Sequence, residues 1–198
     1  MKIIYKIISN FINNKSLYIG EKVTMSEHMI QSAMLAEKAN CNDDLICACL
    51  LHDYGHFLLE DPDELVKNKL DGEHENIGYQ YLKKFFGQKI VEPIKFHVLA
   101  KRYLARDKKY FDFLSDASKI SLKLQGGVLN AKESKEFENK SYFKPSILLR
   151  KFDEAAKRTD IKMKSIHDYE KLLSSKLCLL YTSPSPRDRT RSRMPSSA

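Results

Sequence analysis

Features that mark several large protein classes are missing from this 198-residue chain. No apolar run approaches the roughly 18 residues that a membrane-spanning helix needs. The first 14 residues alternate apolar pairs with Lys2, Lys6 and Asn10, so they lack the unbroken apolar centre of a signal peptide. We therefore expect neither a membrane protein nor an exported one.

The four cysteines form no Cys-x-x-Cys pair and no framework spacing. Cysteines without such spacings are typical of reduced, buried thiols rather than of disulfides or zinc sites. We therefore expect a cytoplasmic protein whose free thiols are Cys41, Cys47, Cys49 and Cys178.

No basic stripe with interleaved aromatic residues is present, although the formal net charge is +8. Lysines are spread through the chain, and residues 178–198 alone carry +3 of this charge. A nucleic-acid interface usually concentrates its basic residues on one face or helix. We therefore expect no nucleic-acid partner, and a small anionic substrate is compatible with the charge that remains.

Composition divides the chain into two parts. Residues 1–177 are long enough to bury the core of one domain. Residues 178–198 have no apolar period and are dense in Ser, Pro and Arg, so we expect a disordered tail. The tail also resembles translated sequencing-adapter read-through, and a genuine basic tail is the alternative.

Alternating Val/Ile/Thr runs are missing, and apolar residues instead recur at intervals of three and four. This period predicts an all-α fold, a single helical bundle without internal repeats. The expected helices cover 3–12, 24–39, 45–56, 73–86, 88–104, 115–127, 146–157 and 166–173, and a further helix begins at Asn130. The expected N-caps are Thr24 or Ser26 for the second helix, Asn42 or Asp43 for the third, and Asn130 with Glu133 for the further helix. Gly126-Gly127 should stop the helix over 115–127.

Five of the six histidines and two aspartates form one ordered series within these predicted helices. Imidazole and carboxylate groups are metal ligands, and a carboxylate between two groups can bridge two ions. Left unpaired in an apolar core, such groups would cost several kcal/mol in desolvation. The series therefore predicts a dinuclear metal centre in the bundle core, formed from His28, His52, Asp53, His56, His74, His97 and Asp153.

Each member of the series also has a structural interpretation. A lone buried histidine is more often a hydrogen-bonded core residue than a ligand, and Asp153 beside Arg150 and Lys151 could be a solvated charge. His52 and Asp53 are consecutive on a predicted helix, so they should diverge by roughly 100° and can serve different ions, or one ion and a bridge. Gly55 removes a side chain beside the predicted centre.

The series resembles the HD-domain superfamily, which is all-α, is named for its adjacent His-Asp pair and includes many metal-dependent phosphohydrolases. Within it, residues 18–157 are most similar to the mixed-valent diiron oxygenases that cleave the carbon–phosphorus bond of 1-hydroxyphosphonates, relatives of myo-inositol oxygenase. The likeness rests on Tyr18-Ile19-Gly20-Glu21, Glu27-His28 with Gln31, Leu50-Leu51-His52-Asp53-Tyr54-Gly55-His56, His97 with Lys101-Arg102-Tyr103-Leu104, Ser115 to Ser118, Gln125-Gly126-Gly127-Val128, and Arg150 with Asp153.

The resemblance implies an Fe(II)/Fe(III) pair with O2 as co-substrate. It assigns one iron to His28, His52, Asp53 and Asp153, and the other to His74, His97 and the bridging Asp53. It also implies that His56 and Lys101 are catalytic residues that lie beside the second iron and meet the substrate. His97 and Lys101 are four apart on one predicted helix, so both side chains project from the same face.

Ser118, Ser121 and Gln125 also share one predicted helical face, and Arg150 lies three residues before Asp153. Hydroxyls, an amide and a guanidinium can together bind a tetrahedral oxyanion, although the serines alone could be ordinary polar surface. The resemblance further implies a lid-side substrate contact by Tyr18 and Glu21, whose carboxylate suits a substrate ammonium. A surface helix start is the alternative for these two residues.

The resemblance implies an enzyme that oxidatively cleaves a small anionic 1-hydroxyphosphonate, with 2-amino-1-hydroxyethylphosphonate to glycine and phosphate as the leading reaction. A metal-dependent phosphohydrolase is the second hypothesis, because the same ligands could hold Mn²⁺, Mg²⁺ or iron. A metal-free interaction module is the third hypothesis and would predict lost ligands. The sequence does not indicate an oligomeric state.

Overall fold

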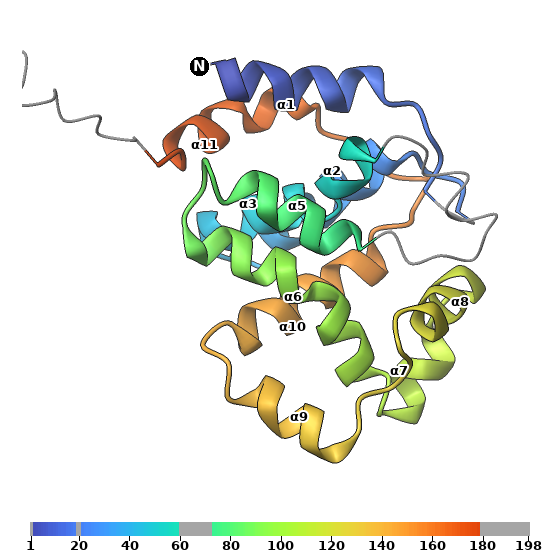
Figure 1. Cartoon of the computed structure of the whole chain (residues 1–198). Coiled ribbons are helices and arrows are strands. Elements are labelled where there is room, and N and C mark those ends of the chain that lie inside the picture. Colours follow the sequence, from blue (N-terminus) through green and yellow to red (C-terminus); the bar gives the residue numbers. More distant parts are fainter. Residues whose placement is uncertain (1, 19–20, 60–72, 179–198) are drawn as a thin grey trace, which may run out of the picture.

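The fold was obtained as a computed structural model, which describes residues 2–18, 21–59 and 73–178. Within these residues the all-α prediction is confirmed, and no strand forms (Figure 1). Backbone pairing of the β type is limited to isolated bridges between Leu17 and Thr24 and between Phe86 and Leu177. Residues 179–198 lie outside the described residues, so the disorder of this segment stays a prediction.

The described residues form α-helices and two 3-10 turns. In chain order they are α1 (Lys2–Asn13), α2 (Met25–Lys38), α3 (Asp43–Leu51), the 3-10 turn η1 (Tyr54–Leu58), α5 (His74–Leu82), α6 (Gln88–Leu104), α7 (Lys108–Phe113), α8 (Asp116–Leu124), α9 (Ala131–Glu138), α10 (Phe143–Ala155), the 3-10 turn η2 (Ile166–Tyr169) and α11 (Glu170–Ser175).

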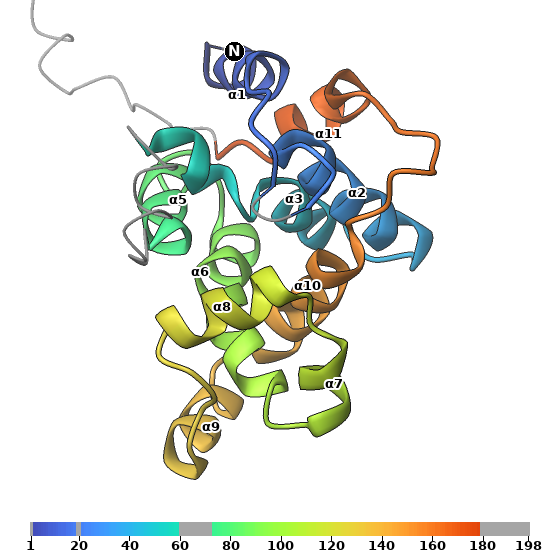
Figure 2. The same cartoon turned by 90° about the vertical axis from the view of Figure 1, so that its right-hand side faces the viewer.

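Five helices form the centre of the molecule: α2, α3, α5, α6 and α10. Helix α6 packs against α3, α5 and α10, and α2 packs against α3 and α10. Figures 1 and 2 place α1 and α11 at one end of this group and α7, α8 and α9 at the other. The main hydrophobic core extends from α1 through α2, α3 and α6, with Ile7, Met29, Leu50 and Ile94 fully buried.

Side-chain caps explain where several helices begin. Thr24 caps α2 in a reciprocal capping box with Glu27, and Asn130 does the same for α9 with Glu133. Asn42 accepts a hydrogen bond from the backbone N–H of Leu45 at the start of α3. These caps confirm the starts that the sequence predicts for the three helices.

Gly126 and Gly127 follow α8 with φ values of 92° and 69°, so the predicted left-handed stop is confirmed. Arg102 of α6 holds this turn, because its Nε donates to Gly127 O at 2.9 Å. The turn fixes the position of Gln125, the last residue before it.

Other predicted helix bounds are wrong. The helix predicted over 45–56 ends at Leu51, and a separate 3-10 turn begins at Tyr54. The helix predicted over 73–86 ends at Leu82, and α10 covers Phe143–Ala155 rather than 146–157. The short helix α7 has no counterpart among the predictions, and it presents Tyr110 to Arg150 of α10.

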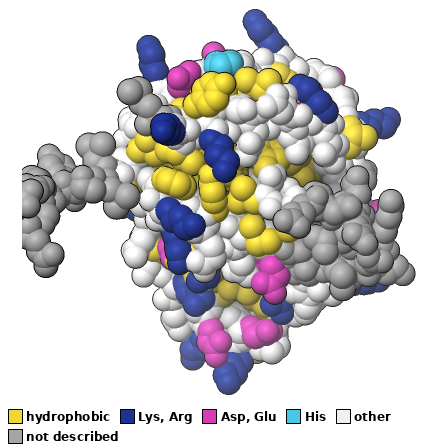
Figure 3. All heavy atoms as spheres, turned by 45° about the horizontal axis from the view of Figure 1, so that its top comes forward, with side chains coloured by type: hydrophobic (Ala, Val, Ile, Leu, Met, Phe, Trp, Pro, Cys, Tyr) yellow, Lys and Arg dark blue, Asp and Glu magenta, His cyan; other side chains and the backbone are white. Residues whose placement is uncertain are grey.

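Helices α1 and α11 form a face that carries exposed hydrophobic side chains (Figure 3). A groove on it is lined by Ile4, Tyr5, Ile8 and Ile12 of α1 and by residues of η2 and α11. Tyr5 is 78% exposed. None of the described helices combines the length and the hydrophobicity that crossing a membrane requires.

Candidate metal centre

The adjacent pair His52 and Asp53 lies at the end of α3, where the helix gives way to η1. His52 keeps helical backbone angles (φ −60°, ψ −40°), whereas Asp53 departs from them (φ −98°, ψ 13°). Both side chains are almost completely buried. The pair therefore lies in the core but outside the helix on which the sequence analysis placed it, and the end of α3 sets its direction.

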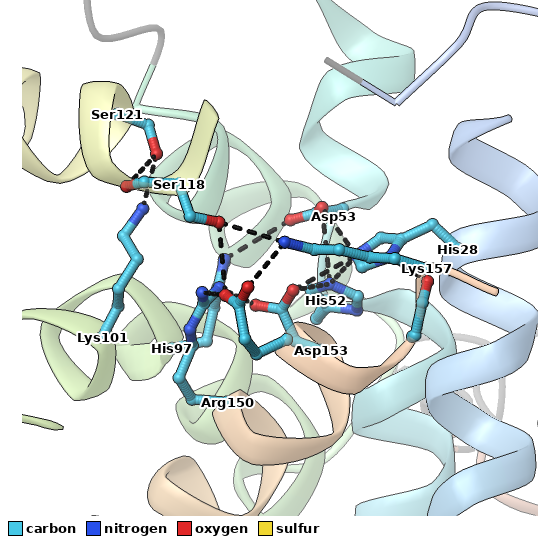
Figure 4. Close-up of polar contacts among 12 residues, drawn as sticks. His28, His52, Asp53, His97, Lys101, Ser118, Ser121, Arg150, Asp153 and Lys157 are labelled. Carbon is cyan, nitrogen blue, oxygen red and sulfur yellow. Dashed lines mark hydrogen bonds and ion pairs between the residues drawn. The ribbon is translucent and has the colours of Figure 1, made fainter. Parts of the chain in front are cut away.

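The first ligand group consists of His28 from α2, His52 and Asp153 from α10 (Figure 4). The Nε2 atoms of His28 and His52 are 3.1 Å apart. Asp153 Oδ1 lies 3.2 Å from His28 Nε2 and 3.8 Å from His52 Nε2. Three residues that are up to 125 positions apart in sequence thus direct their donor atoms at one point.

The second ligand group consists of Asp53, His74 from the start of α5 and His97 from α6. The Nε2 atoms of His74 and His97 are 3.1 Å apart. Asp53 Oδ1 lies 3.3 Å from His74 Nε2 and 3.4 Å from His97 Nε2.

Asp53 joins the two ligand groups. Its other oxygen, Oδ2, lies 3.4 Å from His52 Nε2 and 3.6 Å from His28 Nε2. The two carboxylate oxygens therefore face different groups, which is the arrangement that a bridge between two ions requires. The predicted grouping of the six side chains thus agrees with where the structure places them.

The tautomer of three imidazoles is fixed by backbone carbonyls, which can only accept a hydrogen bond. Nδ1–H of His28 donates to Ala156 O at 2.8 Å, that of His52 to Cys49 O at 2.8 Å, and that of His97 to Ile94 O at 2.6 Å. In the neutral ring the Nε2 lone pair is then free to bind a metal. The Cys49 carbonyl lies at the C-terminal end of α3, where carbonyls have no intrahelical partner.

Charge in the centre favours a cation. Burial alone would raise the pKa of the Asp53 carboxyl, but His52, His74 and His97 hold this pKa well below the usual range. Burial alone would likewise lower the pKa of His52, but Asp53 and Asp153 raise it to about 9. The Asp53 carboxylate is therefore ionised, and the negative charge that favours a proton on His52 would also favour a metal ion in its place.

The donor set fits metal ions. Two ligand atoms that each lie about 2.1 Å from one ion are about 3.0 Å apart at 90° and about 3.4 Å apart at a tetrahedral angle. The imidazole–imidazole and most imidazole–carboxylate distances of both groups fall near this range. Asp153 Oδ1 is buried and accepts no hydrogen bond from the described residues, so a cation would satisfy it.

Gly55 lets η1 approach the start of α5 closely. A Cβ atom on Gly55 would lie 1.9 Å from the backbone oxygen of His74, a distance that no neighbour can accommodate without moving. Glycine at position 55 therefore allows the backbone of His74, a predicted ligand, to lie against η1. His56 follows in the same turn, and its ring stacks on that of His74 with centroids 4.2 Å apart.

Arg150 is fixed by three described partners. Its guanidinium donates to the carboxylates of Asp153 and Glu154, and its Nε donates to Tyr110 Oη at 2.9 Å. Arg150 is 3% exposed and Asp153 is 1% exposed, so the interpretation of Asp153 as a solvated charge is wrong. Arg150 orients a predicted metal ligand, and its role as a substrate contact stays a prediction.

The remaining predicted anion-binding residues come from α6 and α8. Lys101 Nζ donates to Ser121 Oγ at 2.9 Å, and burial, together with Arg150, lowers the pKa of Lys101 to about 7. Ser118 is buried and donates to Glu154 Oε2 at 3.2 Å, so it is not ordinary polar surface. Gln125 Oε1 is buried without a hydrogen bond from the described residues.

Tyr18 and Glu21 lie on the connection between α1 and α2, so they do not begin a surface helix. The Tyr18 ring stacks on the His28 ring with centroids 3.9 Å apart and an interplanar angle of 10°. Glu21 Oε1 lies 3.3 Å from Lys157 Nζ. Tyr18 is therefore next to the first ligand group, and Glu21 pairs with Lys157, which follows α10.

The structure adds three charged residues that the sequence analysis did not single out: Glu75, Glu154 and Lys157. Glu75 Oε2 lies 3.6 Å from His74 Nδ1, and Glu154 receives hydrogen bonds from Arg150, Ser118 and Lys157. Steps of three and four from Arg150 through Glu154 to Lys157 are the signal that could have identified the last two.

Fold and site together define a helical metal-site domain built around an adjacent His-Asp pair. The HD domain family matches residues 25–136, and the chain belongs to this family. The chain is 45% identical over 145 residues to 1-hydroxy-2-(trimethylamino)ethyl phosphonate dioxygenase (glycine-betaine-forming) from Leisingera caerulea, covering 73% of this chain and 74% of that protein. It is 41% identical over 156 residues to hydroxymethylphosphonate dioxygenase from Gimesia maris, covering 77% of each.

Proposed function

We propose that this chain is an iron-dependent oxygenase that cleaves the carbon–phosphorus bond of a small 1-hydroxyphosphonate. The observation that carries the proposal is the pair of ligand groups that share the Asp53 carboxylate, with cationic and hydroxyl side chains beside them. Both relatives named above are dioxygenases of hydroxyphosphonates, which supports this substrate class.

In this proposal His28, His52, Asp153 and Asp53 hold one iron, and His74 and His97 with Asp53 hold the other, as an Fe(II)/Fe(III) pair. When bound, the iron pair supplies the activation of O2 and the oxidation of the hydroxyl-bearing carbon. The ionised Asp53 carboxylate and the imidazoles whose Nδ1–H is held by a backbone carbonyl support this assignment, because each directs a donor atom at the position of the ion, which would displace any proton on Nε2.

The chain's own groups bind and orient the substrate. Lys101 in its ammonium form and Arg150 neutralise the phosphonate dianion, while Ser118, Ser121 and Gln125 form hydrogen bonds to its oxygens. His56, stacked on His74, is positioned to meet the substrate hydroxyl. Tyr18 covers the first ligand group and, with the helices around the centre, excludes water from it.

The overall reaction consumes one O2 for each phosphate. Hydroxymethylphosphonate would give formate and phosphate, and 2-amino-1-hydroxyethylphosphonate, the leading candidate from the sequence, would give glycine and phosphate. Glu21 supplies a carboxylate for the ammonium of the second compound. We also place the protein in the cytoplasm, because its four cysteines are free thiols.

The second candidate function is hydrolysis of a phosphoester or nucleotide, because the same ligands suit other divalent metals. Oxygen dependence separates the two functions. Iron-loaded protein is supplied with hydroxymethylphosphonate or 2-amino-1-hydroxyethylphosphonate, and phosphate release and O2 uptake are measured together. We expect equal amounts of both in air and no phosphate without O2. Unchanged phosphate release in strict anaerobiosis would favour the hydrolase.

A further inference from the structure

Lys157, labelled in Figure 4, follows the end of α10 and has no role in the proposed function, yet its ammonium lies among four oxygen atoms. Nζ donates to Glu154 Oε1 at 2.7 Å and to the hydroxyls of Ser115 and Ser118 at 3.1 Å each. The fourth oxygen is Glu21 Oε1 at 3.3 Å. Lys157 thus connects α8, α10 and the segment before α2.

The pair formed by Lys157 and Glu21 is largely shielded from solvent. Their side chains are 13% and 17% exposed, and Glu21 Oε1 is buried and accepts no hydrogen bond from the described residues. Lys157 Nζ also lies 5.9 Å from the centroid of the Tyr18 ring, which stacks on His28. The Tyr18 ring therefore links the pair to His28 of the candidate metal centre, on the side where the proposed function puts the substituent of the substrate.

The negative charge of Glu21 is compensated by Lys157 among the described residues. Arg150 is shared between Asp153 and Glu154, and the ion pairs of Glu21 among the described residues are limited to the one with Lys157. Without Lys157, the Glu21 carboxylate would be a partly buried, uncompensated negative charge. Such a charge attracts a cation strongly, because screening by water is weak there.

We propose that Lys157 is a specificity-determining residue, because it competes with a cationic substituent of the substrate for Glu21. The inference rests on the proposed function, in which Glu21 faces that substituent. A substrate with a neutral substituent leaves the Lys157–Glu21 pair intact. A substrate with an ammonium must share Glu21 with Lys157 and is repelled by it. Lys157 thereby favours hydroxymethylphosphonate over 2-amino-1-hydroxyethylphosphonate.

Binding measured without turnover tests this inference. Dissociation constants of both phosphonates are determined by calorimetry under strict anaerobiosis, on the iron-loaded full chain and on Lys157→Met, Lys157→Arg, Glu21→Gln and the Glu21→Gln/Lys157→Met double variant. We expect Lys157→Met to shift the affinity ratio about tenfold toward the amino compound. Lys157→Arg, which keeps the charge, should retain the wild-type ratio.

The double variant identifies the partner through which Lys157 acts. With Glu21 already neutral, Lys157→Met should shift the ratio by much less than it does alone, because the contested carboxylate is gone. Iron content and thermal unfolding of each variant show whether the centre and the fold are retained. If Lys157→Met does not fold, Lys157→Gln takes its place in the same cycle.

The outcomes separate this inference from the proposed function. A purely structural role for Lys157 would weaken both phosphonates equally, and an unchanged ratio in a folded, iron-loaded variant would overturn the inference while the proposed function stands. If neither phosphonate binds the wild-type protein or is turned over in air, the proposed function fails and the inference fails with it.

Discussion

The two ligand groups of the candidate metal centre differ in how firmly the protein holds them. In the first group, carbonyl oxygens fix His28 and His52, and Arg150 fixes Asp153. In the second group, a carbonyl fixes His97, but His74 Nδ1 faces Glu75 Oε2 at 3.6 Å, which is longer than a hydrogen bond. His74 is also 8% exposed, whereas His28 and His52 are fully buried.

This difference indicates that one ion site is more rigid than the other. His74 begins α5 directly after Glu73, whose φ of 46° lies in the left-handed region that non-glycine residues seldom adopt. Among the described residues no hydrogen bond holds His74 Nδ1, and a ligand whose second nitrogen is not held loses more rotational freedom when it binds a metal. We therefore expect the ion held by His74 and His97 to bind more weakly than the ion held by the first group.

The largest effect should come from Asp53→Ala, which removes a side chain that faces both groups. We expect loss of both irons and of all measurable turnover, since each site loses a charged ligand. Elemental analysis of reconstituted protein and O2 uptake measure the two effects. Two irons per chain in the variant would show that Asp53 does not bridge them.

Arg150→Met should produce the next largest effect, which is a loss of stability around the first ligand group. It leaves the buried carboxylates of Asp153 and Glu154 without their main partner, and breaking such a pair costs about 3 to 5 kcal/mol of unfolding free energy. Urea denaturation of the metal-free protein measures it.

Arg158→Met is the matched control for this loss. Arg158 pairs with Asp160, and the two side chains are 63% and 68% exposed, so we expect no measurable loss. Equal losses for the two arginines would contradict the view that the first group is held by a buried ion-pair network.

Much of the fold and of the centre could be predicted from the sequence, because short-range chemistry determines it. The apolar period predicted a helix over 88–104, where the structure has α6, and the caps at Thr24, Asn42 and Asn130 predicted three helix starts. The ligand series was recognisable because imidazole and carboxylate are costly to bury without a partner.

The features that could not be predicted depend on tertiary contacts between segments that are distant in sequence. The apolar run through Leu50 and Leu51 continues the period of α3, yet the helix ends there, and the two oxygens of Asp53 face opposite ligand groups. The partners Lys157 and Glu21 are 136 positions apart in sequence, so only the packing of α10 against the rest of the bundle brings them together. No local pattern encodes such a contact.

Lys101→Met should leave both ligand groups intact and still remove turnover. We expect two irons per chain and a loss of about 100-fold in kcat/KM, because the variant lacks a buried cation for the phosphonate. Lys95→Met on the same helix is the control, since Lys95 lies over the Tyr79 ring. Loss of iron in the Lys101 variant would make Lys101 a support of the second group.

The same lysine predicts a pH dependence. Burial and Arg150 lower its pKa to about 7, so Lys101 carries its charge below that pH and loses it as pH rises. In the wild type, kcat/KM for a phosphonate dianion should fall above pH 7 for this reason. Lys101→Met should lack this decline, and a pH profile that is identical in both proteins would contradict the assignment.

The smallest effect tests the comparison most directly. Glu75→Gln removes the carboxylate charge that lies 3.6 Å from His74 Nδ1, so we expect the second ion to bind more weakly, by less than the roughly tenfold that loss of a hydrogen-bonded outer partner costs. Titration with a chelator should release the iron of the second group at a lower chelator concentration in the variant, with the iron of the first group unchanged.

Glu92→Gln is the control, because the Glu92 carboxylate accepts a hydrogen bond from Tyr79 away from the ligands. This variant should release both irons as the wild type does. If the wild type releases its two irons together and Glu75→Gln shifts both equally, the two sites are equally rigid, and the proposed difference between the groups is wrong.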